Sequence, residues 1–191
     1  NLSFEVLRSP ALRDAISKLT FVTATDGNHG RGVAWTAHRL GAKSVVYMPK
    51  GSAVERLENI RAAGAEASIT IYNYDDAVRF AAEQAEKNGW IMVQDTAWEG
   101  YEDIPRWIIQ GYSTMSLEAY EQLPQRPTHI FVQAGVGSLA TSVTAFFSAA
   151  YPENAPVISV IEPRLADCVF RTAQADDGAL HPVGGDMPTI M

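Results

Sequence analysis

Short, almost entirely apolar runs alternate with helical patterns along the chain, and this alternation restricts the fold more than any other feature. The runs LTFVTAT, KSVVYMP, EASITIY, WIMVQD, THIFVQ and VISVIEP each predict a strand. Strands that are separated by crossover helices form parallel βαβ units. Strands that are apolar throughout are typical of a sheet covered on both faces. We therefore predict an α/β fold, with a parallel sheet and crossover helices.

Local signals indicate where the expected helices begin and end. Residues 52–64 predict a helix in which Ser52 caps the first turn and Glu55 completes a capping box. Residues 73–89 predict a longer helix capped by Asn73. Further helices are expected at the N-terminus and over residues 32–41, 104–123 and 137–151.

Composition and charge narrow the class of protein. The chain has 191 residues, of which 47% are hydrophobic, and its formal net charge is -7. These values suit a globular protein with a sizeable core, and the negative charge argues against binding to nucleic acid or to an anionic membrane. The single cysteine, Cys168, cannot form an internal disulfide. Because no apolar run reaches membrane-spanning length and no signal peptide opens the chain, we expect a cytoplasmic protein.

Three polar clusters follow predicted strands, at the edge where open parallel sheets bind their ligands. They are TDGNHG (25–30), QDTAWEGY (94–101) and QAGVGS (133–138). Asp26 in the first cluster suits either a helix cap or a catalytic carboxylate. Asp95 in the second suits either an Asx turn or a catalytic role. No residue is assigned as a metal ligand.

The third cluster allows three interpretations. Its glycines and the helix that follows can form a cradle of backbone N–H groups for a phosphate. They can equally form a close-packed turn that needs glycine for its dihedral angles. Gly135, Gly137 and Ala140 also fit a dinucleotide-binding fingerprint, with Glu162 as the acid that binds the ribose. The dinucleotide interpretation leaves the other two clusters without a role, so we disfavour it.

The first and third clusters together resemble enzymes of the tryptophan-synthase β-subunit fold type, which use pyridoxal phosphate (PLP). The first resembles their Asn-His loop, and the strand, Pro and helix that follow it also match. The resemblance implies that Asn28 hydrogen-bonds the 3-hydroxyl of the cofactor ring. It also implies that the phosphate is bound by Gly135, Val136, Gly137, Ser138 and Leu139.

Longer strings narrow the resemblance to the diaminopropionate ammonia-lyases. TATDGNHGRGVAW, YMPKGSA, NYDD, QDTAWEGY, IPRWIIQGY and GGDMPTIM resemble that family and span residues 23–191. The family converts both enantiomers of 2,3-diaminopropionate, a small amino acid, to pyruvate and ammonia. Removing the Cα proton from opposite faces calls for two bases, so a lysine would serve one face and Asp26 the other. Asp95 would bind the β-ammonium group or share in proton transfer, and the full-length enzyme would be a homodimer.

The resemblance also implies that part of the site lies outside this chain. The family's PLP lysine lies in an F-K-x-x-G-A segment upstream of the Asn-His loop, and no such segment surrounds Lys18, Lys43, Lys50 or Lys87. We therefore expect an inactive fragment of a longer enzyme. On the family pattern, residues 25–102 form the small domain, while residues 1–24 and 103–191 belong to the large PLP-binding domain. Other possibilities are a serine or threonine dehydratase-like PLP enzyme, an NAD-binding domain and a non-catalytic binding module.

Overall fold

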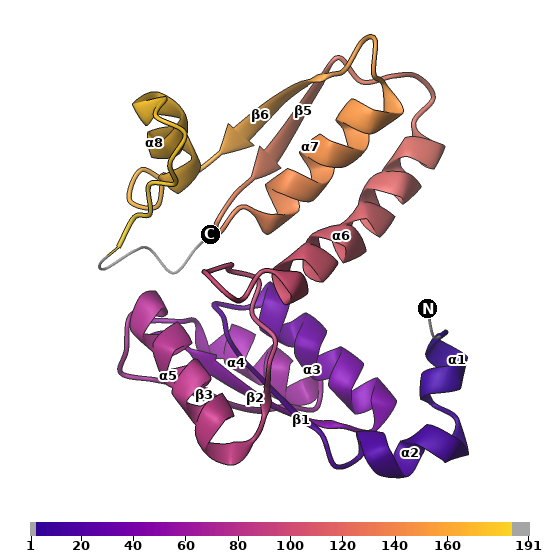
Figure 1. Ribbon diagram of the computed structural model, residues 1–191, viewed down its shortest axis with the longest axis vertical. Helices are drawn as coiled ribbons and strands as arrows, with labels where there is room; N and C mark the ends of the chain where they lie inside the picture. Colours follow the sequence, from indigo (N-terminus) through magenta and orange to yellow (C-terminus); the bar gives the residue numbers. More distant parts are fainter. Residues whose placement is uncertain (1–2, 185–191) are drawn as a thin grey trace. The chain divides into compact units, whose positions relative to one another are not determined.

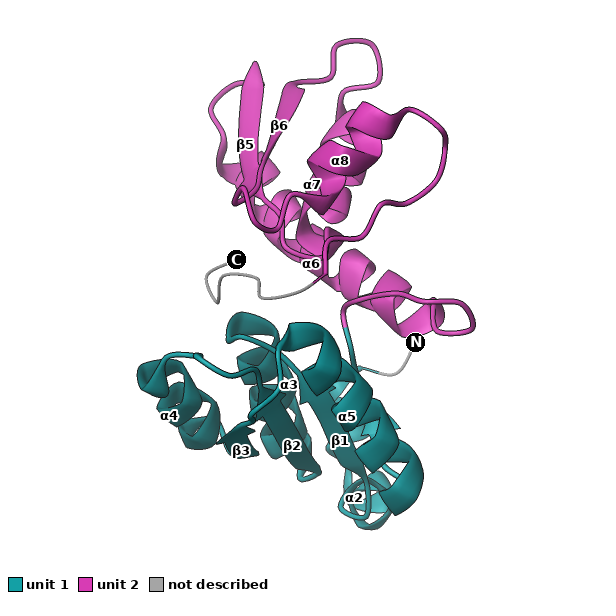
Figure 2. Cartoon of the chain, turned by 90° about the vertical axis from the view of Figure 1, so that its left-hand side faces the viewer, with its two compact units in different colours: residues 1–94, 185–190 teal, residues 95–184, 191 magenta. Residues whose placement is uncertain are grey.

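The chain divides into two compact units (Figure 2). The computed structural model describes residues 3–184. Unit 1 runs from the N-terminus to Gln94, and unit 2 runs from Asp95 to Gly184. Among residues 3–184, every helix is too short or too polar to span a bilayer.

Unit 1 is built on a parallel four-stranded sheet in the order β3-β2-β1-β4, of which Figure 1 labels β1, β2 and β3. Its elements in chain order are α1 (Phe4–Leu7), α2 (Pro10–Ile16), β1 (Thr20–Ala24), α3 (Asn28–Leu40), β2 (Lys43–Met48), α4 (Val54–Ala62), β3 (Glu66–Ile69), α5 (Tyr74–Asn88) and β4 (Ile91–Met92). The expected N-terminal helix is thus two short helices, and Pro10 begins the second of them.

Both faces of this sheet are covered, because alternate residues of a strand point to opposite sides. Val46 and Met48 of β2 pack on the face that carries α3 and α4. The helical residues buried on that face are Ala34, Leu57 and Ile60. Val45 and Tyr47 of β2 pack on the opposite face against α5. The alanines that α5 buries there, at helical spacing, are Ala77, Ala81 and Ala85.

Unit 2 contains a parallel pair of strands joined by a crossover helix. Its elements are α6 (Asp103–Gln122), β5 (His129–Gln133), α7 (Ser138–Ala150), β6 (Val157–Ile161) and α8 (Cys168–Ala175). α7 packs on one face of the pair and along α6 (Figure 1). On the other face, Phe131 is 71% exposed and Ile161 is 53% exposed. The prediction that both faces of the sheet are covered is therefore confirmed for unit 1, but it is wrong for β5 and β6.

The prediction of an α/β fold with parallel strands and crossover helices is confirmed. The predicted ends of α5 are also confirmed. The Asn73 side chain accepts a hydrogen bond from the N–H of Asp76 at 2.9 Å. Gly89 follows the helix in the left-handed conformation that glycine adopts most readily.

Two predictions about helix starts are wrong. α4 begins at Val54 with Ala53 at the cap position, and no side chain caps it, so Ser52 and Glu55 do not form a capping box. α3 begins at Asn28 rather than near residue 32, which places the second half of the TDGNHG cluster inside the helix. The Ser52 side chain bonds to the distant Asp26 instead of to the start of α4, while Thr25 bonds to backbone N–H groups at the start of α3.

The sequence pattern does not predict α8, whose first turn is bound by a side chain from the end of the preceding strand. Glu162 lies just after β6, and its carboxylate accepts the N–H groups of Val169 at 3.0 Å and Phe170 at 2.8 Å. Glu162 thus satisfies donors that the first turn of a helix leaves unpaired. The predicted limits of the large and small domains remain predictions, since they refer to domains of a longer protein.

Candidate functional site

The turn from β1 into α3 is held by Thr25. Its Oγ1 accepts the N–H groups of Gly27 at 3.1 Å and Gly30 at 3.4 Å, which are donors that the start of a helix leaves without partners. Gly27 occupies the cap position and has no side chain to cap with. The alternative that Asp26 caps this helix is therefore wrong, and its carboxylate has different partners.

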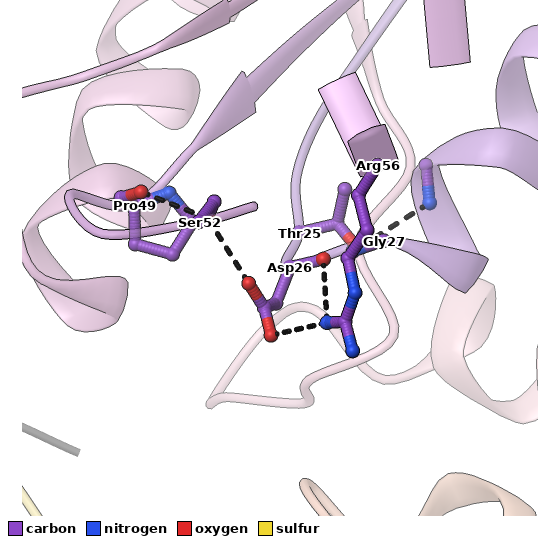
Figure 3. A network of polar contacts seen from close by, with 7 residues as sticks. Thr25, Asp26, Gly27, Pro49, Ser52 and Arg56 are labelled. Carbon is purple, nitrogen blue, oxygen red and sulfur yellow. Dashed lines mark hydrogen bonds and ion pairs between the residues drawn. The ribbon is translucent and has the colours of Figure 1, made fainter. Parts of the chain in front are cut away.

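The Asp26 carboxylate is bound through both of its oxygens (Figure 3). Oδ1 accepts a hydrogen bond from the Ser52 hydroxyl at 3.0 Å, and Oδ2 accepts one from Arg56 Nη1 at 2.7 Å. The same Arg56 nitrogen donates to the main-chain oxygen of Asp26 at 3.0 Å. The Asp26 side chain is only 12% exposed. Ser52, just before α4, and Arg56, in its first turn, therefore fix the orientation of this carboxylate.

Burial dominates the electrostatics of Asp26. Desolvation raises the pKa of its carboxyl above the ordinary value of 3.8, while the Ser52 hydrogen bond and the charge of Arg56 act in the opposite direction. An ion pair by itself would lower the pKa. A carboxylate with a raised pKa is a stronger base than an ordinary aspartate, so the environment of Asp26 suits proton abstraction.

Asn28 and His29 begin α3 and differ in their partners. The Asn28 side chain is exposed and makes no hydrogen bond with any residue of the described chain. His29 Nε2 lies 2.8 Å from the Val93 carbonyl oxygen. Because a carbonyl can only accept, Nε2 must carry the proton. His29 therefore links α3 to the segment after β4, while Asn28 is available to a ligand.

Two glycines of α3 are expected to respond in opposite ways to alanine. At Gly30 a Cβ would lie 2.3 Å from Thr25 Cγ2 and 2.9 Å from Val46 Cγ1, whereas at Gly32 it would meet nothing within 4 Å. Gly30→Ala should destabilise by about 1–3 kcal/mol through overpacking. Gly32→Ala should stabilise by roughly 0.5–1 kcal/mol, because alanine favours the helix. Melting temperatures of the two variants test this, and shifts of the same sign would contradict it.

The loop from β5 into α7 presents consecutive backbone donors. The N–H of Ala134 pairs with the Ile161 carbonyl at 3.0 Å. The backbone N–H groups of the next five residues, 135–139, donate no hydrogen bond to another residue of the described chain. Gly137, at the cap position of α7, has φ 92°, in the left-handed region. Unpaired donors in succession, at the positive end of a helix, suit an anion such as phosphate.

Ser138 and Asp95, which belong to different polar clusters, contact each other within unit 2. The Ser138 hydroxyl donates to the main-chain oxygen of Asp95 at 2.7 Å. The hydroxyl is therefore engaged, and the backbone N–H is the group of Ser138 left for an anion. Burial raises the pKa of Tyr112, and the negative charge of Asp95 raises it further. The Asp95 carboxylate thus acts on a tyrosine of α6 that the sequence did not single out.

The structure weakens the dinucleotide-binding alternative. In the dinucleotide-binding fingerprint the acid binds a hydroxyl of the ribose. Both Glu162 oxygens instead accept N–H groups at the start of α8, as described above, and the Cys168 thiol also donates to Oε1 at 3.5 Å. Burial and the Glu162 carboxylate raise the pKa of the Cys168 thiol, as expected for an unreactive cysteine.

Sequence reasoning missed two residues near the first cluster. Arg56 looks like an ordinary helix charge, and its pairing with Asp26 appears only in three dimensions. Gln94 is fully buried, and its Oε1 accepts the Thr23 hydroxyl at 2.9 Å and the Ala24 N–H at 3.0 Å. Its position at the head of the second polar cluster was the available signal. Gln94 fixes the end of β1, from which the Asp26 turn departs.

Known proteins resemble this chain over nearly its whole length. The family model described as "Pyridoxal-phosphate dependent enzyme" matches residues 3–190. A diaminopropionate ammonia-lyase of Salmonella typhimurium is 56% identical over 195 residues, which cover 100% of this chain and 48% of the relative. A biosynthetic L-threonine dehydratase of the same organism is 32% identical over 169 residues, covering 88% of this chain and 30% of the relative.

Solved structures agree with these matches. The crystal structure of diaminopropionate ammonia lyase from Escherichia coli in complex with D-serine superposes with a TM-score of 0.83 at 47% identity. The match covers 97% of this chain and 47% of that chain. This chain therefore spans about half the length of the relatives that it matches. The resemblance inferred from the sequence strings is confirmed, although the GGDMPTIM string lies beyond the described residues except for Gly184.

Proposed function

Because the chain belongs to the family of pyridoxal-phosphate dependent enzymes, we propose that it is part of a diaminopropionate ammonia-lyase. The full-length enzyme would convert D- and L-2,3-diaminopropionate to pyruvate and ammonia by α,β-elimination. One observation carries this proposal: similarity to diaminopropionate ammonia-lyases extends over the whole chain and exceeds that to the threonine dehydratase. The NAD-binding and non-catalytic alternatives are not favoured.

The residues of this chain fit PLP at two places. The unpaired N–H groups of residues 135–139 would hold its phosphate, and Gly137 leaves room for the backbone to curl around that group. Asn28, whose side chain is available, would hydrogen-bond the ring 3-hydroxyl. When bound, PLP supplies an electron sink for a carbanion at the substrate Cα. The lysine that would bind it covalently lies outside these residues, so the chain alone would be inactive.

Two carboxylates of this chain would act on the substrate. Asp26 would take the Cα proton of one enantiomer, and the lysine would act on the other face. A carboxylate has about four acceptor sites, so Asp26 retains free lone pairs beside its bonds to Ser52 and Arg56. Asp95 would pair with the β-ammonium group of the substrate, or share in proton transfer, through its negative charge.

The domain organisation and cellular context belong to the same proposal. Residues 25–102 would form the small domain of the full-length enzyme, and residues 1–24 and 103–191 would belong to its PLP-binding domain. The enzyme would be a homodimer in the cytoplasm. Its partner would be a small amino acid, with no role for nucleic acid or a membrane, in keeping with the net charge of -7.

Product analysis with the full-length protein tests this function. With either enantiomer of 2,3-diaminopropionate, we expect pyruvate and two ammonia for each turnover. L-Threonine and L-serine, at the same concentration, should react far more slowly. Faster conversion of L-threonine to its 2-oxo acid would favour the dehydratase alternative. Absence of turnover together with tight NAD binding would favour the interpretation of the glycine loop as a dinucleotide-binding site.

A further inference from the structure

The two partners of the Asp26 carboxylate, Arg56 and Ser52, differ in whether they can bond to both its ionised and its protonated form. Arg56 can only donate and carries a positive charge, so its bond to Oδ2 favours an oxygen that carries no proton. Ser52 Oγ both donates and accepts, and it lies 3.0 Å from Asp26 Oδ1 and 2.9 Å from the carbonyl oxygen of Pro49. Figure 3 shows Ser52 between these two oxygens, and Arg56 on the other side of the carboxylate.

We infer that Arg56 and Ser52 are positioning residues for Asp26, with Arg56 holding the ionised carboxylate and Ser52 supporting both its ionised and its protonated form. This inference rests on the proposed role of Asp26 as a base. Because Oδ2 faces a cation, the proton that Asp26 takes from the substrate belongs on Oδ1. In that step the Cα–H bond breaks, an Oδ1–H bond forms, and the electron pair stays on the substrate.

Ser52 suits both states because its hydroxyl has one proton and two neighbouring acceptors. With Asp26 ionised, the hydroxyl can donate to Oδ1. With Oδ1 protonated, the hydroxyl can turn to donate to the Pro49 carbonyl and accept from Asp26. Ser52 is buried, so water does not replace it readily. A buried carboxyl would otherwise lose a partner each time its charge changed.

Arg56 acts on the position of the carboxylate and on its charge. One nitrogen bonds both Oδ2 and the main-chain oxygen of the same residue, which restricts rotation of the Asp26 side chain. Within residues 3–184, the groups that act on the pKa of this carboxyl are the Ser52 hydroxyl and the Arg56 guanidinium, both from the 52–56 segment. Without Arg56, desolvation would raise the pKa of Asp26 further.

The first test measures Asp26 directly, whatever its role in the reaction. In the full-length protein labelled with [4-¹³C]aspartate, the Asp26 signal is assigned by its loss in Asp26→Asn and titrated by NMR. Arg56→Met and Ser52→Ala should each raise the pKa of Asp26, since each removes an interaction that lowers it. Arg56→Lys should restore most of the change. Lys87→Met, which removes the same charge from an exposed site on α5, should leave the pKa unchanged. An unshifted pKa in Arg56→Met would overturn the inference.

The second test separates the inference from the proposed function. Ser52→Ala should reduce turnover of the enantiomer that depends on Asp26 on the order of tenfold to a hundredfold, as misplacement of a reacting group does. Ser52→Thr, which keeps a hydroxyl, should recover most of it, and the other enantiomer should change little. Equal losses for both enantiomers would overturn the positioning role. If the pKa of Asp26 shifts but turnover of both enantiomers is unchanged, the contacts of Asp26 are confirmed and its role as the base is refuted.

Discussion

Replacing Asp26 with Asn is expected to abolish turnover of D-diaminopropionate by the full-length enzyme and to leave turnover of the L enantiomer largely intact. Asparagine keeps the size of the side chain but cannot accept the proton. Loss of a general base lowers rates by about a hundredfold to ten-thousandfold. The lysine proposed for the opposite face still serves the other enantiomer. Steady-state rates with each pure enantiomer measure the effect.

A matched control distinguishes a base from a structural residue. Asp14→Asn makes the same change at an exposed carboxylate on α2 and should leave both rates unaltered. Asp26→Asn loses the ion pair with Arg56, so its melting temperature is measured as well, and any loss of stability should lower the rates for both enantiomers alike. The raised pKa of Asp26 adds a pH signature. The D-specific rate should fall on acidification at a pH above that expected for an ordinary aspartate, because the proton-accepting form is lost there first. Equal losses for D and L would contradict the two-base scheme.

Replacing Gly137 with Val in the full-length enzyme should weaken PLP affinity on the order of a hundredfold. Gly137 has φ 92°, which side-chain-bearing residues rarely adopt, so the loop must shift. The shift would misalign neighbouring N–H donors. Loss of two charge-assisted hydrogen bonds to a phosphate, at roughly 1.5 kcal/mol each, accounts for that factor. Titration of the apoenzyme with PLP gives the affinity directly.

The control for this prediction uses another glycine with a positive φ. Gly178 has φ 75° in the loop after α8, and a Cβ there, as at Gly137, meets nothing within 4 Å. Gly178→Val should therefore share the backbone strain and leave PLP affinity unchanged. Circular dichroism of both variants should match the parent. An unaltered PLP titration in Gly137→Val would identify the loop as a packing turn.

The sequence predicts those parts of the fold that depend on local patterns. The alternation of apolar runs and helices is sufficient for the parallel βαβ architecture, since each strand and helix carries its own periodicity. Asn73 is correctly predicted as a cap because its partner, Asp76, is close in sequence. Ser52 is wrongly predicted because the same kind of local pattern competes with a distant partner, Asp26, and the distant partner prevails.

The candidate site depends more on contacts between distant residues. Nothing near Asp26 in the sequence indicates that Arg56 pairs with it. The position of Glu162 fits a ribose-binding acid in the sequence, but in the structure its carboxylate binds the first turn of α8. The succession of unpaired N–H donors in the glycine loop is predictable, because it follows from closely spaced glycines and a helix start. The role proposed for Asn28 comes from family resemblance, since an exposed amide has no distinguishing physical signature in a sequence.

The central claim is that these residues provide a phosphate cradle and a ring contact for PLP but not the lysine that binds it. Lys18, Lys43, Lys50 and Lys87 all lie at exposed positions. Borohydride reduction of the full-length holoenzyme, followed by digestion and mass spectrometry, locates the modified lysine. We expect one pyridoxyl-lysine, in a peptide outside residues 1–191. A stoichiometric pyridoxyl group on any of the four lysines within them would contradict the claim.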